Sequence, residues 1–122
     1  MRVCRWQSSM DDVTGGITAP LGFQSAALHC GIKAKAGALD LAVIAADGPA
    51  SAAALFTTNL AQAAPVLVSR DHLAASNGTA RAIVVNSGCA NACTGETGLR
   101  DAREMATAVA SGLGCNERDV LV

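Results

Sequence analysis

The sequence predicts a mixed α/β fold of the α+β type, and three patterns lead to this expectation. Residues 80–85 are apolar and largely β-branched apart from Arg81, as in a strand that is covered on its faces. Residues 98–112 repeat apolar side chains every three or four positions, as in a helix with one buried face. Several other short apolar segments are separated by Gly, Pro and Asp, which favour turns.

The first third of the chain is expected to hold two strands. Residues 1–14 match no structural pattern and are predicted to be a loose N-terminal tail. Residues 15–22 contain Pro20 and three glycines, so they are expected to form turns. Strands are then predicted over residues 23–32 and 39–46, joined by a flexible basic segment.

The later elements are expected to alternate between strands and helices. Asp47-Gly48-Pro49 is strong turn chemistry and predicts a hairpin into a strand over residues 50–57. Residues 65–69 are predicted to be a short strand, and residues 70–76 a helical turn. Residues 119–122 begin another strand.

Composition excludes several classes of partner. The formal net charge is −1 and the pI is near 6.0, which gives no electrostatic reason to bind nucleic acid or an anionic membrane. The apolar runs are far shorter than a membrane span. Aromatic residues make up 2% of a chain rich in alanine, so burial of its side chains gains little hydrophobic free energy. This composition is compatible with a segment that packs into a larger core.

The cysteines favour reduced thiols. Five of them occur without a secretory signal, which predicts a cytoplasmic location. Cys89 and Cys93 lie four apart, but the sequence has no second closely spaced Cys or His pair, so no metal is expected. Cys93 also has no evident base, because His72 is expected in a polar turn and His29 in an apolar, strand-like run.

The most informative segment is an amide-rich run of small residues between the strand at 80–85 and the helix after it. It reads Asn86-Ser87-Gly88-Cys89-Ala90-Asn91-Ala92-Cys93-Thr94-Gly95. Such a junction presents backbone N–H groups at the positive end of a helix, which suits an anionic group. The alternative is a tight turn whose Asn side chains bond their own backbone.

This run and several others resemble the ArgJ family, the glutamate N-acetyltransferase/ornithine acetyltransferase proteins of arginine biosynthesis. The other matching segments, in order, are Gly15-Gly16-Ile17-Thr18-Ala19-Pro20-Leu21-Gly22-Phe23, Leu39-Asp40-Leu41-Ala42, Phe56-Thr57-Thr58-Asn59, Ala63-Ala64-Pro65-Val66 and Asp101-Ala102-Arg103. The resemblance runs from residue 15 to the end of the chain. It implies a partial αββα layered sandwich of the DmpA/ArgJ type, in which residues 15–122 are the N-terminal part of the domain, truncated at its C-terminus.

The resemblance also implies a reaction. Members of the family move an acetyl group from N2-acetylornithine to glutamate through an acetyl-threonine, without a cofactor, and some accept acetyl-coenzyme A. The threonine is freed by self-cleavage in mid-chain, and a Thr-Gly oxyanion pair is expected a few residues beyond Val122. This chain would then hold no catalytic residue and would be inactive alone. Its partners would be the C-terminal part of the same precursor and, as an oligomer, further cleaved chains.

The resemblance assigns candidate substrate-binding roles to Asn86, Asn91 and Thr94, through side-chain hydrogen bonds to the substrate or to the oxyanion loop. In the alternative interpretation these residues only shape the turn. Two other function classes stay open at this point: a related self-cleaving aminopeptidase or amidase, and a non-catalytic structural module. The second is favoured by the absence of a nucleophile and base pair in the sequence.

Overall fold

A computed structural model describes residues 15–122, and the expected loose tail at 1–14 lies outside the described residues. The elements are four strands, two α-helices and one 3₁₀ turn. In chain order they are β1 (Phe23–Leu28), β2 (Leu41–Ser51), α1 (Ala64–Ala75), β3 (Thr79–Asn86), α2 (Gly95–Leu113), η1 (Glu117–Asp119) and β4 (Val120–Leu121). The α+β expectation is confirmed.

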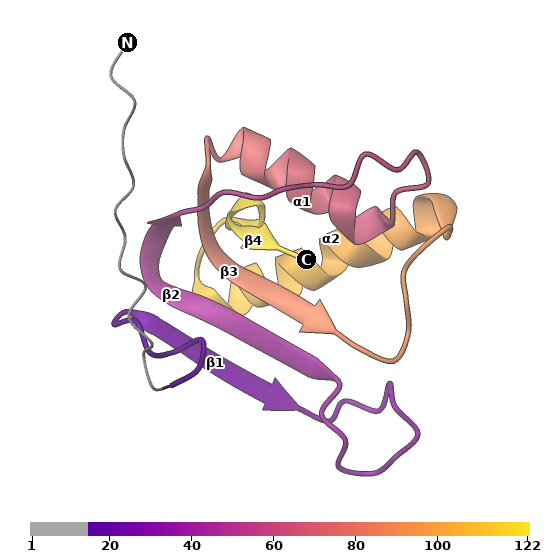
Figure 1. Ribbon diagram of the computed structural model, residues 1–122, viewed down its shortest axis with the longest axis horizontal. Coiled ribbons are helices and arrows are strands. Elements are labelled where there is room, and N and C mark those ends of the chain that lie inside the picture. The colour runs from indigo at the N-terminus through magenta and orange to yellow at the C-terminus, as the bar shows by residue number, and fades with distance from the viewer. Residues whose placement is uncertain (1–14) are drawn as a thin grey trace.

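The four strands form one sheet in the order β1-β2-β3-β4 (Figure 1). The first three strands are antiparallel, whereas β4 pairs with β3 in parallel, with Ala82 opposite Val120 and Ile83 opposite Leu121. The connection from β3 to β4 runs through α2, because parallel neighbours need a crossover. The carboxyl ends of β3 and β4 therefore lie at the same end of the sheet.

The core lies between the sheet and α2. Its buried members are small or branched: Ala82, Val84, Ala106, Ala110 and Val120. A second buried cluster joins the two helices through Ala64, Val68 and Ala102. The next side chains along β3, Ile83 and Val85, point to the other face and are 41% and 49% exposed. One face of the sheet is thus packed and the other is open, as in half of a layered sandwich.

Helix α1 closes the edge of the sheet at β4. The Ser69 hydroxyl donates to the Val122 carbonyl at 2.9 Å and accepts from the Val122 N–H at 2.9 Å. The His72 ring nitrogen Nδ1 lies 2.8 Å from the Val120 carbonyl, which can only accept, so Nδ1 carries the proton. These bonds occupy backbone groups that an edge strand would leave unpaired.

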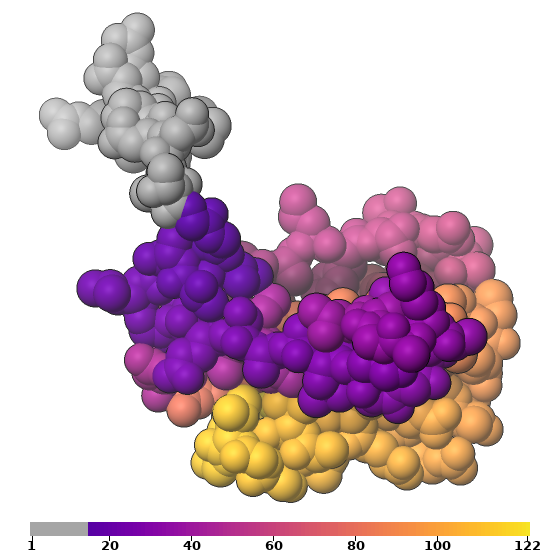
Figure 2. Space-filling view, turned by 90° about the horizontal axis from the view of Figure 1, so that it is seen from below, coloured from indigo at the N-terminus to yellow at the C-terminus, as the bar shows by residue number. Residues whose placement is uncertain are grey.

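At the opposite edge, β1 is exposed along its whole length. A hollow of about 400 Å³ lies between β1, β2 and the C-terminal part of α2, lined by Ala26, Val43 and Leu113 among others. Figure 2 shows this side of the molecule, with β1 in indigo and the end of α2 in yellow.

Two predictions for the middle of the chain are wrong. The expected hairpin at Asp47-Gly48-Pro49 is absent, since β2 continues through these residues to Ser51. The pairing of β2 with β3 shifts between Ala45 and Ala50, so a β-bulge absorbs the turn-forming residues. The expected strand over 50–57 is therefore the end of β2 followed by an irregular segment.

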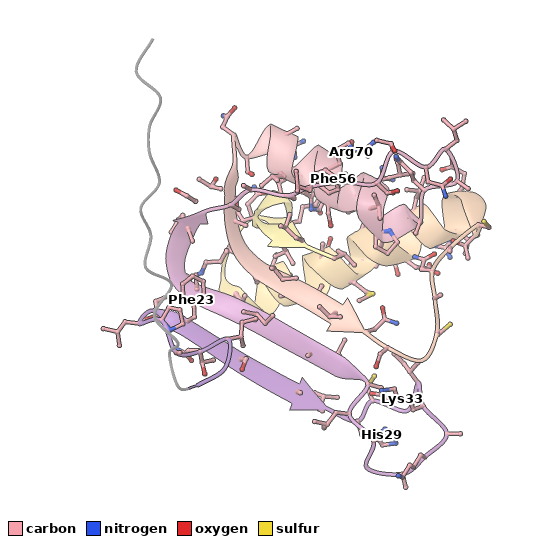
Figure 3. The ribbon with its side chains drawn as sticks, in the orientation of Figure 1. Phe23, His29, Lys33, Phe56 and Arg70 are labelled. Atoms are coloured by element: carbon pink, nitrogen blue, oxygen red, sulfur yellow. The ribbon has the colours of Figure 1, made fainter. Side chains whose placement is uncertain are left out.

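The expected strand over residues 65–69 is the first part of α1. Pro65 stands in its first turn, where the missing N–H costs nothing. The buried residues Ala64, Val68 and His72 are spaced by four, which is a helical pattern that faces α2 and β4. The irregular segment before α1 is tied to the helix by Arg70, whose guanidinium lies 5.2 Å from the centre of the Phe56 ring (Figure 3).

The remaining strand and helix predictions are confirmed with shifted ends. The strand predicted at 23–32 ends at Leu28, and the strand predicted at 39–46 begins at Leu41. The helix predicted at 98–112 begins three residues earlier, at Gly95. Neither described helix is long and apolar enough to cross a membrane.

Candidate functional site

The amide loop, residues 86–95, links the end of β3 to the start of α2. The Asn86 side-chain nitrogen donates to the Cys89 carbonyl at 3.0 Å. The Asn91 carbonyl accepts from the Ala64 N–H at 3.3 Å, which ties the loop to the beginning of α1. The loop is therefore fixed to three elements.

Asn91 and Thr94 of the amide loop pack tightly against Gly98 in the first turns of α2. The Asn91 side-chain nitrogen donates to the Gly98 carbonyl at 2.8 Å, and the Thr94 hydroxyl donates to the Asn91 side-chain oxygen. A Cβ on Gly98 would collide with the Thr94 hydroxyl oxygen and the Asn91 side-chain oxygen. Gly98 is thus required here by close approach rather than by an unusual backbone angle.

A second loop, residues 29–40, lies beside the amide loop and is here called the carboxylate loop. It is organised by Asp40, which is 2% exposed and whose side chain is fully buried. One carboxylate oxygen accepts from the Cys30 N–H at 2.6 Å, and the other accepts from the Lys33 N–H at 2.9 Å and lies 3.0 Å from His29 Nδ1. Figure 3 shows His29 and Lys33 on this loop, beyond the end of β1.

The charge of Asp40 is stabilised by these donors. Burial alone would raise the pKa of its carboxyl group, but the N–H groups of Cys30 and Lys33, with His29 nearby, outweigh burial and hold the pKa well below its usual range. Asp40 is therefore a carboxylate at neutral pH. The same carboxylate raises the pKa of the Cys30 thiol.

The two loops line a common hollow of about 460 Å³. Asn86, Asn91 and Thr94 contribute to it from the amide loop and the start of α2, and Cys30 and Ile32 from the carboxylate loop. The structure thus brings all three predicted site residues to one cavity. It also shows that each of the three bonds within its own loop, as the turn-shaping interpretation requires.

A second hollow, of about 340 Å³, adjoins the first along the end of β3. Its lining includes Val84, Asn86 and Asn91, together with Val122. The hollow lies along β3 just past the end of its pairing with β4.

The side chains that line the hollow of about 460 Å³ offer mainly hydrogen-bond donors and acceptors. Asn and Thr side chains supply neutral hydrogen-bond donors and acceptors, and Asp101 adds a carboxylate to the same lining. Thr94 donates to Asn91 and not to a base. Over residues 15–122 no group of three or more His, Cys, Asp or Glu side chains lies close enough to hold a metal ion.

The histidines lie elsewhere than expected. His72 was predicted in a polar turn, yet it is buried in α1 and bonded to β4. His29 was predicted inside a strand, and it follows the end of β1 and bonds Asp40. The sequence interpretation missed Asp40 and Gly98 as structural determinants of the site. A signal for Asp40 was present, since it is a single acid between apolar residues at the start of a predicted strand.

Comparison with known proteins places the chain in a family. The sequence model of the ArgJ family matches residues 24–122. The arginine biosynthesis bifunctional protein ArgJ of Dehalococcoides mccartyi is 49% identical over 118 residues, and that of Geobacter sulfurreducens is 52% identical over 101 residues. The matches cover 95% and 83% of this chain but 29% and 25% of those two proteins. The chain thus spans less than a third of the length of these relatives.

Two crystal structures share the fold. ArgJ from Bacillus halodurans superposes with a TM-score of 0.83 at 42% identity, covering 88% of this chain and 55% of that one. Ornithine acetyltransferase from Mycobacterium tuberculosis, solved in complex with ornithine, gives a TM-score of 0.79 at 46% identity, covering 88% of this chain and 57% of that one. The family match, the sequence identities and the shared fold agree that this chain belongs to the ArgJ family.

Proposed function

We propose that the complete protein is an acyltransferase that moves an acetyl group from N2-acetylornithine to glutamate in arginine biosynthesis. The observation that carries the proposal is the 46% identity and TM-score of 0.79 to an ornithine acetyltransferase crystallised with ornithine. The names of the bacterial relatives also refer to arginine biosynthesis. The family assignment favours this activity over the aminopeptidase or amidase alternative.

The chain described here is proposed to supply part of the site and not the nucleophile. Its matches cover 29% of a full-length relative but 55% of a crystallised chain. This difference supports the implied cleavage of the precursor, because a protein cut near its middle gives chains of about half its length. The C-terminal part of the same precursor is then the partner that brings the nucleophilic threonine, and cleaved chains associate further into an oligomer.

The parallel pairing of β3 and β4 supports a place for the oxyanion pair. A chain that continues beyond Val122 in the direction of β4 would run beside Val84 and Asn86 and enter the hollow of about 340 Å³. The Thr-Gly pair implied a few residues later would then lie next to the amide loop. N–H groups held rigidly at such a position stabilise the negative charge that develops in acyl transfer.

Asn86, Asn91 and Thr94 are proposed to contact the amino-acid substrate. All three line the hollow of about 460 Å³. Each Asn amide has two N–H groups, and the bonds to the Cys89 and Gly98 carbonyls use one of them in each case. The second N–H of each amide can then bond a substrate carboxylate without a change in the loop.

A cytoplasmic location is proposed as well. Cys30, Cys89, Cys93 and Cys115 are all free thiols among the described residues. Free thiols in this number suit a reducing compartment.

The test uses the complete protein and the 122-residue chain side by side. With acetylornithine and glutamate, the complete protein is expected to form acetylglutamate, while the isolated chain forms none above a buffer blank. A second arm replaces acetylornithine by acetyl-coenzyme A and determines whether that donor is accepted. Free acetate without acetylglutamate from the complete protein would indicate a hydrolase. Turnover by the repurified 122-residue chain alone would overturn the assignment of the nucleophile to the C-terminal part of the precursor.

A further inference from the structure

We infer that Asp40 is a positioning residue for the substrate site, which sets the distance between the carboxylate loop and the amide loop. The inference rests on the proposed function, because it assigns a role in that same site. It concerns a buried charge that is not among the lining residues of the hollow of about 460 Å³.

The side chain of Asp40 is hydrogen-bonded to three other residues of the carboxylate loop. Its two oxygens reach the N–H groups of Cys30 and Lys33 and the ring of His29, which lie seven to eleven residues away in sequence. The Lys33 ammonium donates to the Leu39 carbonyl at 2.9 Å and closes the same loop from its other side. One ionised group thus replaces the regular strand pairing that the loop lacks.

The backbone of Asp40 joins this loop to its neighbours. Its N–H donates to the Leu28 carbonyl at 3.0 Å, at the end of β1. Its carbonyl accepts from the Ser87 N–H at 2.9 Å, in the first turn of the amide loop. A single residue therefore holds the carboxylate loop with its side chain and the amide loop with its main chain.

The two loops also touch directly. A Cβ built on Gly88 would lie 2.9 Å from Lys33 Cγ and 3.2 Å from Ile32 Cγ2, so no space separates the loops here. Ile32 and Cys30 are in turn part of the lining of the hollow of about 460 Å³. Movement of the carboxylate loop would therefore shift one wall of the cavity that holds Asn86 and Asn91.

The experiment replaces Asp40 in the complete protein and measures both substrates. Asp40→Asn keeps the shape of the side chain and removes its charge, and it is expected to lower kcat/KM by about 10- to 100-fold, as for loss of hydrogen bonds to a charged group. The loss should come mainly from a higher KM, because the displaced wall binds substrate while the nucleophile lies in the other chain. Asp47→Asn is the matched control, since Asp47 lies in β2 as an exposed side chain that accepts from Gln24, and it should leave kcat/KM within about twofold of wild type.

A second variant and a second readout keep the test decisive if Asp40→Asn folds poorly. His29→Ala removes one of the three donors and should raise KM in the same direction by a smaller factor. Alkylation of Cys30, located by peptide mass spectrometry, should be faster in Asp40→Asn, because the carboxylate that raises the pKa of this thiol is gone. Cys115 follows the C-terminal end of α2, whereas the amide loop precedes its N-terminal end, so Cys115 should react at the wild-type rate.

Unchanged KM in both variants, or a loss of activity that matches the loss of folded protein, would overturn the positioning role. A wild-type protein that makes no acetylglutamate would instead refute the proposed function. In that case hydrogen exchange of the Cys30 and Lys33 N–H groups, which should be faster in Asp40→Asn, still decides whether Asp40 holds the loop.

Discussion

The two loops that line the candidate site are held by different chemistry. The carboxylate loop depends on one buried charge that collects donors from three residues, and the segment between them has little structure of its own. The amide loop depends on neutral side chains and on small residues that allow close approach, with Gly98 as the clearest case. A charge can organise a loop of almost any sequence around it, whereas a closely packed amide loop tolerates few substitutions.

The largest expected effect tests the packing of the amide loop. Gly98→Ala in the complete protein places a methyl group against Asn91 and Thr94, and overpacking of this kind costs about 1–3 kcal/mol of unfolding free energy. Activity should fall as well, because both displaced side chains line the hollow. Gly112→Ala is the matched control in the same helix, since nothing lies within 4 Å of its Cβ position, and alanine there should stabilise α2 by up to about 1 kcal/mol. Equal urea midpoints for the two variants would refute the close-approach argument.

A loss of activity without a comparable loss of stability is expected for the amides themselves. In the complete protein, Asn86→Ala and Asn91→Ala should each lower the catalytic efficiency about 10- to 100-fold, the value of one hydrogen bond to a charged ligand, or roughly 1.5–3 kcal/mol. Thermal denaturation of the same variants should change much less than turnover. If the melting temperature falls while the efficiency of the folded enzyme holds, the amide loop is only a scaffold.

The third prediction tests the charge in the carboxylate loop through its pH dependence. The pKa of Asp40 is lowered in the folded protein, so its contribution to stability is fully present above the unfolded value of about 4 and is lost as the pH falls toward the folded value. Urea midpoints of the wild-type protein and Asp40→Asn should therefore converge as the pH is lowered from 6 to 3. Among the described residues, the His29 ring and the Cys30 thiol are the titratable side chains that contact this carboxylate, and His29→Ala tests the contribution of the ring contact. A constant difference between the two proteins at all pH values would contradict the assignment.

The parts of the fold that sequence reasoning predicted are those with a clear local pattern. The helix α2 follows from a periodicity that its burial matches, and β3 and β4 follow from runs of apolar, β-branched residues. The expectation that β3 is covered on its faces is wrong for one face, since Ile83 and Val85 are exposed. The strand expected at 65–69 failed because the β-branched residues of α1 are buried through contacts with α2 and β4, which no local pattern reveals. The hairpin expected at Asp47 failed because a bulge can hold the same residues as a turn.

The three candidate residues came from the sequence, but the cavity that they share did not. Asn86, Asn91 and Thr94 line one hollow, which the structure alone reveals. Their contacts with substrate stay a prediction. Asp40 and Gly98 act through partners that are distant in sequence or through the space beside them, and single residues of this kind carry no periodic signal.

The bonds from α1 to β4 have a consequence for the order of folding. Ser69 and Val122 are 53 residues apart, so their contact closes a long loop that contains β3, the amide loop and α2. Closing it costs more chain entropy than the nearby pairing of β1 with β2, and parallel pairing must wait for the crossover helix. The candidate site lies where β3 and β4 end. This end of the sheet is therefore expected to become rigid only in the last steps of folding.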